Sequence, residues 1–235
     1  MQLNTFVLAL AATFIAAPAT AREICPAALV RDMAAEAPAC RLVAKGRLNS
    51  ARGNEAVAWR LYRWMSTLEE PSGLEDEPPY NQNAVTLSLA ARPGDPPFFE
   101  AHYWMDVAWF EPPYLATNPD YGEILVVPGR YAGTGGFIED RVFLPDDAKR
   151  WIEIGGGVNA ENGTGWPDGL KAYLPPGHGL WKGILVDYAT LTGVTAVWRE
   201  GDANCCPSGG EIAFRLHIAG PEPHLEVAEA QYVPQ

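Results

Sequence analysis

The stretch TAVWRE-GDANCCPSGG-EIAFRLHIA, residues 195–219, shows most directly how this chain folds. In Glu211–Ala219, apolar side chains recur at every second position, as in a strand with one buried face. Thr195–Glu200 has the composition of a second strand. Between the two, Pro207 and the pair Gly209-Gly210 favour a sharp reversal of the chain. The stretch therefore predicts two neighbouring antiparallel strands.

The same pattern of short strands and turns extends over most of the chain. The sequence contains 23 glycines and 21 prolines, which favour many turns and few long helices. Further strands are predicted at 56–65, 85–91, 98–110, 123–127, 141–144, 151–154, 180–188 and 224–232. Strands and helices do not alternate, so a parallel sheet is not expected. The predicted fold is mainly β, an antiparallel sandwich or a curved open sheet with one N-terminal helix.

That helix is predicted at Pro26–Glu36, because proline suits a first helical turn and an apolar stripe follows it. We expect three parts in the chain: residues 1–21, an N-terminal helical segment at 22–45, and a single antiparallel β domain at 46–235. If the β region were two domains, the boundary would lie within the glycine-rich residues 155–169.

The first 21 residues resemble a secretion signal. Phe6–Ala17 is apolar except for Thr13, and it is shorter than the ~20 residues that cross a bilayer. Pro18 and the small residues Ala19-Thr20-Ala21 follow, which predicts cleavage after Ala21. The residues before Phe6 carry no lysine or arginine, which is atypical. We expect an exported protein, periplasmic or secreted, that does not span a membrane.

Composition excludes some partners of the exported chain. The formal net charge is −12, which disfavours binding to nucleic acid or to an anionic membrane surface. Hydrophobic residues make up 48% of the chain, enough for a folded core.

Four cysteines, Cys25, Cys40, Cys205 and Cys206, are expected to form disulfides in an oxidising compartment. Three pairings are possible. A bond between the adjacent Cys205 and Cys206 would join Cα atoms only about 3.8 Å apart, below the usual span for a disulfide. Avoidance of that strained ring favours bridges from Cys25 and Cys40 to Cys205 and Cys206, although the local pairing remains an alternative.

Two groups of residues are candidates for binding. Asp202, Asn204 and Ser208 lie in the turn around the adjacent cysteines, where they either bind a ligand or only shape the loop. Trp104 and Trp109 share an aromatic stretch, and they form either a platform for a sugar ring or peptide, or part of the core.

The sequence contains no pattern of catalytic, metal-binding or cofactor-binding residues, and we expect no cofactor. We therefore expect a non-catalytic binding or interaction protein of the cell envelope, whose partner is an unknown envelope component or protein. The alternative is a hydrolase of envelope polysaccharide or peptide that uses a pair of carboxylates. A cleft lined by two close carboxylates, one with a raised pKa, would favour the hydrolase.

The segment Gly201–Gly210 and the preceding Ala196-Val197-Trp198-Arg199-Glu200 resemble a motif of uncharacterised bacterial exported proteins. The chain is similar to LppP/LprE-type lipoproteins in carrying Asp-x-Asn-Cys-Cys-Pro-Ser before a C-terminal strand. It lacks the lipid-attachment cysteine of those proteins, because the bulky Ile24 precedes Cys25. The resemblance covers about fifteen residues; it implies an exported bacterial protein and carries no activity with it.

Overall fold

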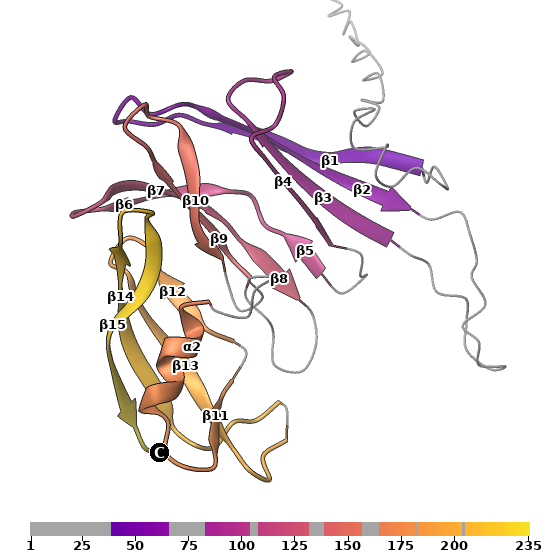
Figure 1. The fold of residues 1–235 in the computed structure, drawn as a ribbon. Helices are drawn as coiled ribbons and strands as arrows, with labels where there is room; N and C mark the ends of the chain where they lie inside the picture. The colour runs from indigo at the N-terminus through magenta and orange to yellow at the C-terminus, as the bar shows by residue number, and fades with distance from the viewer. Residues whose placement is uncertain are drawn as a thin grey trace, which may run out of the picture.

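The computed structural model describes residues 39–65, 83–103, 108–131, 139–156, 165–181, 183–203 and 205–235. In this part of the chain, three antiparallel sheets and a two-stranded ribbon account for nearly all regular structure (Figure 1). The N-terminal sheet has the order β1-β2-β3-β4: β1 (Ala39–Leu48), β2 (Val57–Met65), β3 (Asn83–Ala90) and β4 (Phe99–Tyr103). The middle sheet has the order β10-β9-β7-β6: β6 (Tyr114–Asn118), β7 (Gly122–Val127), β9 (Arg141–Pro145) and β10 (Trp151–Gly156).

The C-terminal sheet is built around β13 (Thr192–Arg199), which pairs with β14 and with two short strands. The other strands of this sheet are β11 (His178–Leu180), β12 (Leu185–Asp187), β14 (Glu211–Ala219) and β15 (His224–Val233). The ribbon joins β5 (Ala108–Phe110) to β8 (Gly129–Tyr131). The prediction of a mainly β chain with antiparallel sheets is confirmed, and one sheet curls into half a barrel.

The middle sheet lies between the other two, because both of its faces are apolar. All six residues of β7 are buried. Ile124 and Val126 point into a core shared with the C-terminal sheet, whereas Leu125 and Val127 point into a core shared with the N-terminal sheet. The continuous apolar run Ile124–Val127 within β7 is the pattern expected of a strand covered on both faces.

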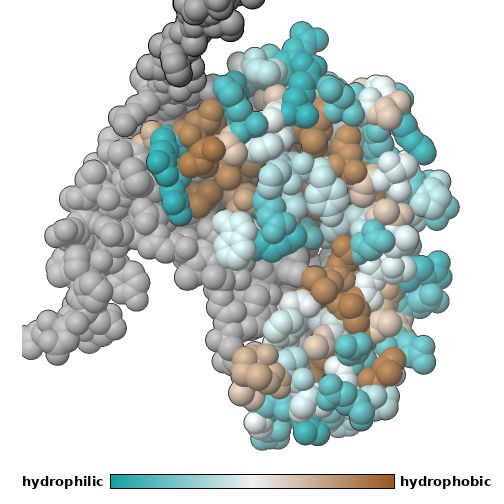
Figure 2. Space-filling view, turned by 180° about the vertical axis from the view of Figure 1, so that it is seen from behind, coloured by the Kyte–Doolittle hydropathy of each residue, from teal (hydrophilic) through white to brown (hydrophobic). Residues whose placement is uncertain are grey.

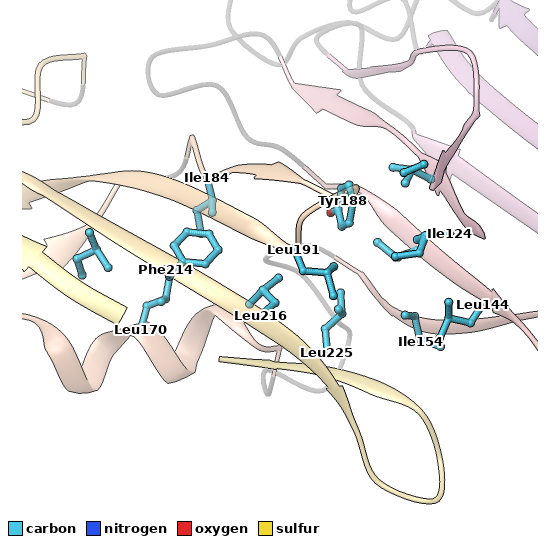
Figure 3. Close-up of a cluster of buried hydrophobic side chains, with 14 of the residues drawn as sticks. Ile124, Leu144, Ile154, Leu170, Ile184, Tyr188, Leu191, Phe214, Leu216 and Leu225 are labelled. Atoms are coloured by element: carbon cyan, nitrogen blue, oxygen red, sulfur yellow. The ribbon is translucent and has the colours of Figure 1, made fainter. Parts of the chain in front are cut away.

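The core toward the C-terminal sheet is the larger of the two. Figure 3 shows Ile124, Leu144 and Ile154 of the middle sheet on one side of this core, beside Leu216 of β14 and Leu225 of β15. Seen from behind, the described hydrophobic residues at the surface form small separate areas among hydrophilic ones (Figure 2).

The middle sheet also holds the connection between β1 and β2 through a buried carboxylate. Glu123 on β7 is 4% exposed. It accepts hydrogen bonds from the hydroxyl of Ser50, from the backbone N–H of Ala51 at 2.7 Å and from the side-chain amide of Asn54 at 2.9 Å. Burial alone would raise the pKa of Glu123, but these hydrogen bonds outweigh it and lower the pKa.

The helix predictions require correction. The helix predicted at Pro26–Glu36 lies outside the described residues, and β1 begins at Ala39, so the segment 22–45 that was expected to carry this helix ends in a strand of the N-terminal sheet. The described helix is α2 (Pro167–Leu170), followed by a 3₁₀ turn, η1 (Lys171–Tyr173). The sequence predicted only strands and turns there, which was wrong. Four residues are too few for an apolar period to show, so only Pro167 in the first turn marks the helix.

Candidate functional site

The loop between β13 and β14 is organised around Asp202, one of the residues expected to bind. Its carboxylate accepts hydrogen bonds from the backbone N–H of Arg199 at 2.9 Å, from the backbone N–H of Ser208 at 2.8 Å and from the Ser208 hydroxyl at 2.5 Å. The Trp198 indole donates to the Asp202 carbonyl at 3.0 Å. The Asp202 side chain is 8% exposed. The hydrogen bonds from Ser208 and from the Arg199 backbone lower the pKa of Asp202 to about 2.

Asp202 and Ser208 therefore lie together, but their polar atoms are hydrogen-bonded to each other and to the loop backbone. This arrangement favours the shaping role for these two residues over ligand binding. The third predicted residue of the loop, Asn204, lies outside the described residues.

The cysteine pairing favoured by the sequence is wrong. Cys205 is bonded to Cys206, with the two Cα atoms 3.8 Å apart. Cys40 is disulfide-bonded as well, and the fourth cysteine, Cys25, lies outside the described residues. Because Asp202 and Ser208 fix both ends of the loop, the adjacent pair is held without any bridge to the N-terminal segment.

Trp109 is 43% exposed, as expected for a binding platform, and lies on β5 opposite Arg130 of β8. Trp104 lies outside the described residues, so a platform that includes both tryptophans stays a prediction. In the described residues, no hydrogen bond, ion pair or ring contact joins Trp109 to the loop of Asp202.

Arg130 lies in a cluster of charged and phenolic groups that the sequence analysis did not predict. Its guanidinium contacts the carboxylate of Asp140 at 2.5 Å and the carboxylate of Glu111 at 3.3 Å. The Asp140 side chain is 7% exposed and also bonds to the buried hydroxyl of Tyr188. Burial raises the pKa of Asp140, and the charge and hydrogen bond of Arg130 offset only part of that effect.

The cluster connects the β5–β8 ribbon and the middle sheet to the C-terminal sheet, since Arg130 is the central residue of β8, Asp140 directly precedes β9 and Tyr188 directly follows β12. Burial raises the pKa of Tyr188, and the nearby charge of Asp140 raises it further. A neutral Tyr188 donating to Asp140 is the arrangement that these shifts favour.

A groove of about 460 Å³ opens between the α2–η1 segment and β15. Trp166, Tyr173, His224, Glu226 and Val227 are among its lining residues. Figure 1 shows α2 lying beside the C-terminal sheet. A Cβ added at Gly169, on the helix, would come within 3.1 Å of the Val227 side chain, so the glycine allows the helix to approach β15 closely.

The aromatic residues of the groove differ in exposure. The ring of Trp166 packs on Phe214 with centroids 5.3 Å apart, which fixes its position. Tyr173 is 40% exposed. Together they offer a fixed ring and an accessible ring on one side of the groove.

Two polar residues of the groove, His224 and Glu226, contact each other. His224 contacts the Glu222 carbonyl through Nδ1 at 2.8 Å and the Glu226 carboxylate through Nε2 at 2.7 Å. Both imidazole nitrogens face acceptors, so the backbone contact and then the Glu226 contact raise the pKa of His224. The second Glu226 oxygen lies 3.6 Å from Nε2 of His217.

Neither the cluster nor the groove could be identified from sequence spacing. Arg130 lies within β8 and Asp140 directly precedes β9, so only the course of the chain brings them together, and the groove depends on the short helix that the sequence did not reveal. Within the described ranges, no group of His, Cys, Asp and Glu side chains is arranged to hold a metal ion. No helix among these residues has the length and apolarity needed to cross a membrane.

Comparison of the chain with protein-family models, with curated proteins and with solved structures found no match in any of the three. The geometry of the described residues therefore carries the functional argument alone.

Proposed function

We propose that this chain is an exported, non-catalytic binding protein of the bacterial cell envelope, and that it binds an envelope component in the groove between α2–η1 and β15. The groove is the observation that carries the proposal. It is open to solvent, and it combines aromatic rings with a small number of polar groups, as ligand sites generally do.

The chemistry of the lining favours a saccharide. The exposed ring of Tyr173 can stack on the apolar face of a sugar. The Glu226 carboxylate can accept hydrogen bonds from sugar hydroxyls, and its contact with His224 fixes its orientation. An exported protein would meet such ligands in the cell wall.

Calorimetric titration of the protein with soluble fragments of bacterial cell-wall glycan tests this proposal. We expect saturable binding by the unchanged protein and binding weaker by at least roughly two- to tenfold in Tyr173→Ala, since one aromatic stacking contact contributes roughly 0.5–1.5 kcal/mol beyond the apolar area it buries. Trp109→Ala is the matched control, because Trp109 is equally exposed but lies on β5. Loss of binding in Trp109→Ala but not in Tyr173→Ala would place the site on β5 and refute the groove.

The export part of the proposal has its own test. It rests on the apolar run Phe6–Ala17 and the small residues before Arg22. N-terminal sequencing of protein recovered from a bacterial host should find Arg22 as the first residue. A chain that begins at Met1 would contradict export by this route.

One observation favours the second candidate, a hydrolase with a carboxylate pair. Asp140 has a raised pKa, and Glu111 lies on the same guanidinium. Against this, Asp140 is buried and both of its neighbours, Arg130 and Tyr188, already occupy its oxygens, whereas a general acid must reach its substrate. Release of reducing ends from cell-wall glycan, lost in Asp140→Asn, would favour the hydrolase over the binding protein.

A further inference from the structure

The disulfide between Cys205 and Cys206 differs from a structural bridge in two ways: it is exposed, and it closes no loop of the chain. Both cysteines are exposed at the tip of the loop between β13 and β14. Their Cα atoms are 3.8 Å apart, whereas most disulfides join Cα atoms roughly 4.4–6.8 Å apart. A bridge stabilises a fold mainly by closing a long stretch of the unfolded chain, and this one closes no intervening residue. Stability therefore does not account for it.

The loop is held by contacts that do not involve the sulfur atoms. Asp202 accepts three hydrogen bonds, from Arg199 and Ser208, across the base of the loop. On the C-terminal side, the backbone N–H of Gly209 donates to Val197 at 2.8 Å, and the Tyr232 hydroxyl donates to the Gly209 carbonyl at 2.6 Å. The two cysteines would remain side by side at the surface whether or not they are bonded.

We propose that Cys205 and Cys206 form a thiol–disulfide exchange site that accepts electrons from an external dithiol. Exposed and strained disulfides are the ones that exchange readily, because the attacking thiolate must reach a sulfur atom and the ring is relieved when it opens. This proposal does not depend on the groove or on its ligand.

The exchange balances with one dithiol. A thiolate of the dithiol attacks one sulfur of the pair; the bond between Cys205 and Cys206 breaks, a mixed disulfide forms, and the released cysteine sulfur takes up a proton. The second thiol of the dithiol, as a thiolate, then attacks the mixed disulfide at the dithiol's own sulfur. It displaces the remaining cysteine, which is protonated. The dithiol becomes a disulfide, and the pair gains two electrons and two protons.

The test is a timed reduction of the full mature protein with dithiothreitol under native conditions, followed by maleimide labelling and peptide mapping. We expect two thiols, at Cys205 and Cys206, to appear at least about tenfold faster than a thiol at Cys40, which is half-buried on β1 and also disulfide-bonded. Oxidised glutathione should then restore the bond between the adjacent pair. Labelling of Cys40 first, or of all cysteines together, would overturn the proposal.

The double variant Cys205→Ser/Cys206→Ser is the matched control. It should show no early thiols, and its melting temperature should stay within about 3 °C of the unchanged protein, because the loop keeps its hydrogen bonds. The selectively reduced protein should melt in the same range. A much larger fall in either sample would show that the pair is a structural bridge, and resistance to dithiothreitol until the protein unfolds would show the same.

Discussion

The contact between Glu123 and the β1–β2 connection gives the sharpest test of how the layers are joined. Glu123 is the only charged residue within β7, and its carboxylate accepts from Ser50, Ala51 and Asn54 of the neighbouring sheet. Replacement by alanine leaves these three donors without their acceptor. Ser50 and Asn54 are half-buried, and a donor held away from water that loses its partner costs about 1–3 kcal/mol, whereas the exposed backbone at Ala51 can be rehydrated. We therefore expect Glu123→Ala to lower the free energy of unfolding by about 3 kcal/mol.

The assay is urea unfolding followed by tryptophan fluorescence, with thermal melting as a second measure. For a chain of this length, a loss of about 3 kcal/mol corresponds to a melting temperature lower by roughly 6–12 °C. Glu229→Ala is the control. Glu229 is likewise a strand carboxylate with a partner on another strand, Arg215 at 3.0 Å, but both side chains are more than half exposed, so its loss should cost under about 1 kcal/mol.

The same contact predicts a pH dependence. Because the pKa of Glu123 is lowered in the folded state, its contribution is fully present above the ordinary value of 4.5 and is lost as pH falls through the folded-state pKa. The difference between the unchanged protein and Glu123→Ala should therefore shrink on acidification below pH 4.5. A loss under 1 kcal/mol at pH 7, or a difference that does not shrink in acid, would refute the reasoning.

Three further predictions concern the core, a close backbone approach and the loop of Asp202. Leu125 is fully buried between the middle and N-terminal sheets, so Leu125→Ala should lower the free energy of unfolding in urea by about 3 kcal/mol. Leu185→Ala, at a side chain that is 59% exposed, should change it by no more than about 0.5 kcal/mol, and equal losses would contradict the layered packing. Gly193→Ala should lower the free energy of unfolding by about 2 kcal/mol in the same assay, because the new Cβ would lie 2.5 Å from the Leu185 carbonyl oxygen and overlap the Phe214 ring. Gly179→Ala should be tolerated, because the nearest neighbour of its Cβ would be 3.8 Å away. Because the pKa of Asp202 is lowered to about 2, its contribution to stability is complete above the ordinary value of 3.8 and disappears as pH falls through about 2. The amide NMR signals of Arg199 and Ser208 should therefore shift only below about pH 4, and Asp202→Asn should abolish that titration. A midpoint near 4 would show that the carboxylate is not held as described.

The strands could be predicted where burial imposes a simple period. Glu211–Ala219 was predicted with the bounds of β14, because its buried and exposed residues alternate. The predicted strand at residues 180–188 contains only the last residue of β11 and the three residues of β12, two short strands that pair with different parts of β13. Alternation over nine residues does not reveal where a strand leaves its partner, so the break could not be seen in the sequence.

The candidate site was harder to predict, because its residues meet only through strand register. Trp109 was identified by its residue type, but its position opposite Arg130 depends on the pairing of β5 with β8. The contact between Arg130 and Asp140, ten residues apart, requires the chain to come back to β8 just before β9 begins. Tyr173 and His224 line one groove because α2 packs beside β15, and no local pattern in the sequence encodes that contact.

The cysteine prediction failed for a reason that also bears on function. It assumed that a strained ring is avoided when a long-range bridge can stabilise the fold instead. In the structure, Asp202 and Ser208 fix the loop by hydrogen bonds, so the fold needs no bridge there, and the cysteines are left at the surface with each other as partners. A disulfide that is not needed for stability is free to open. The same hydrogen bonds that made the long-range pairing unnecessary therefore make reversible exchange at Cys205 and Cys206 compatible with an intact fold.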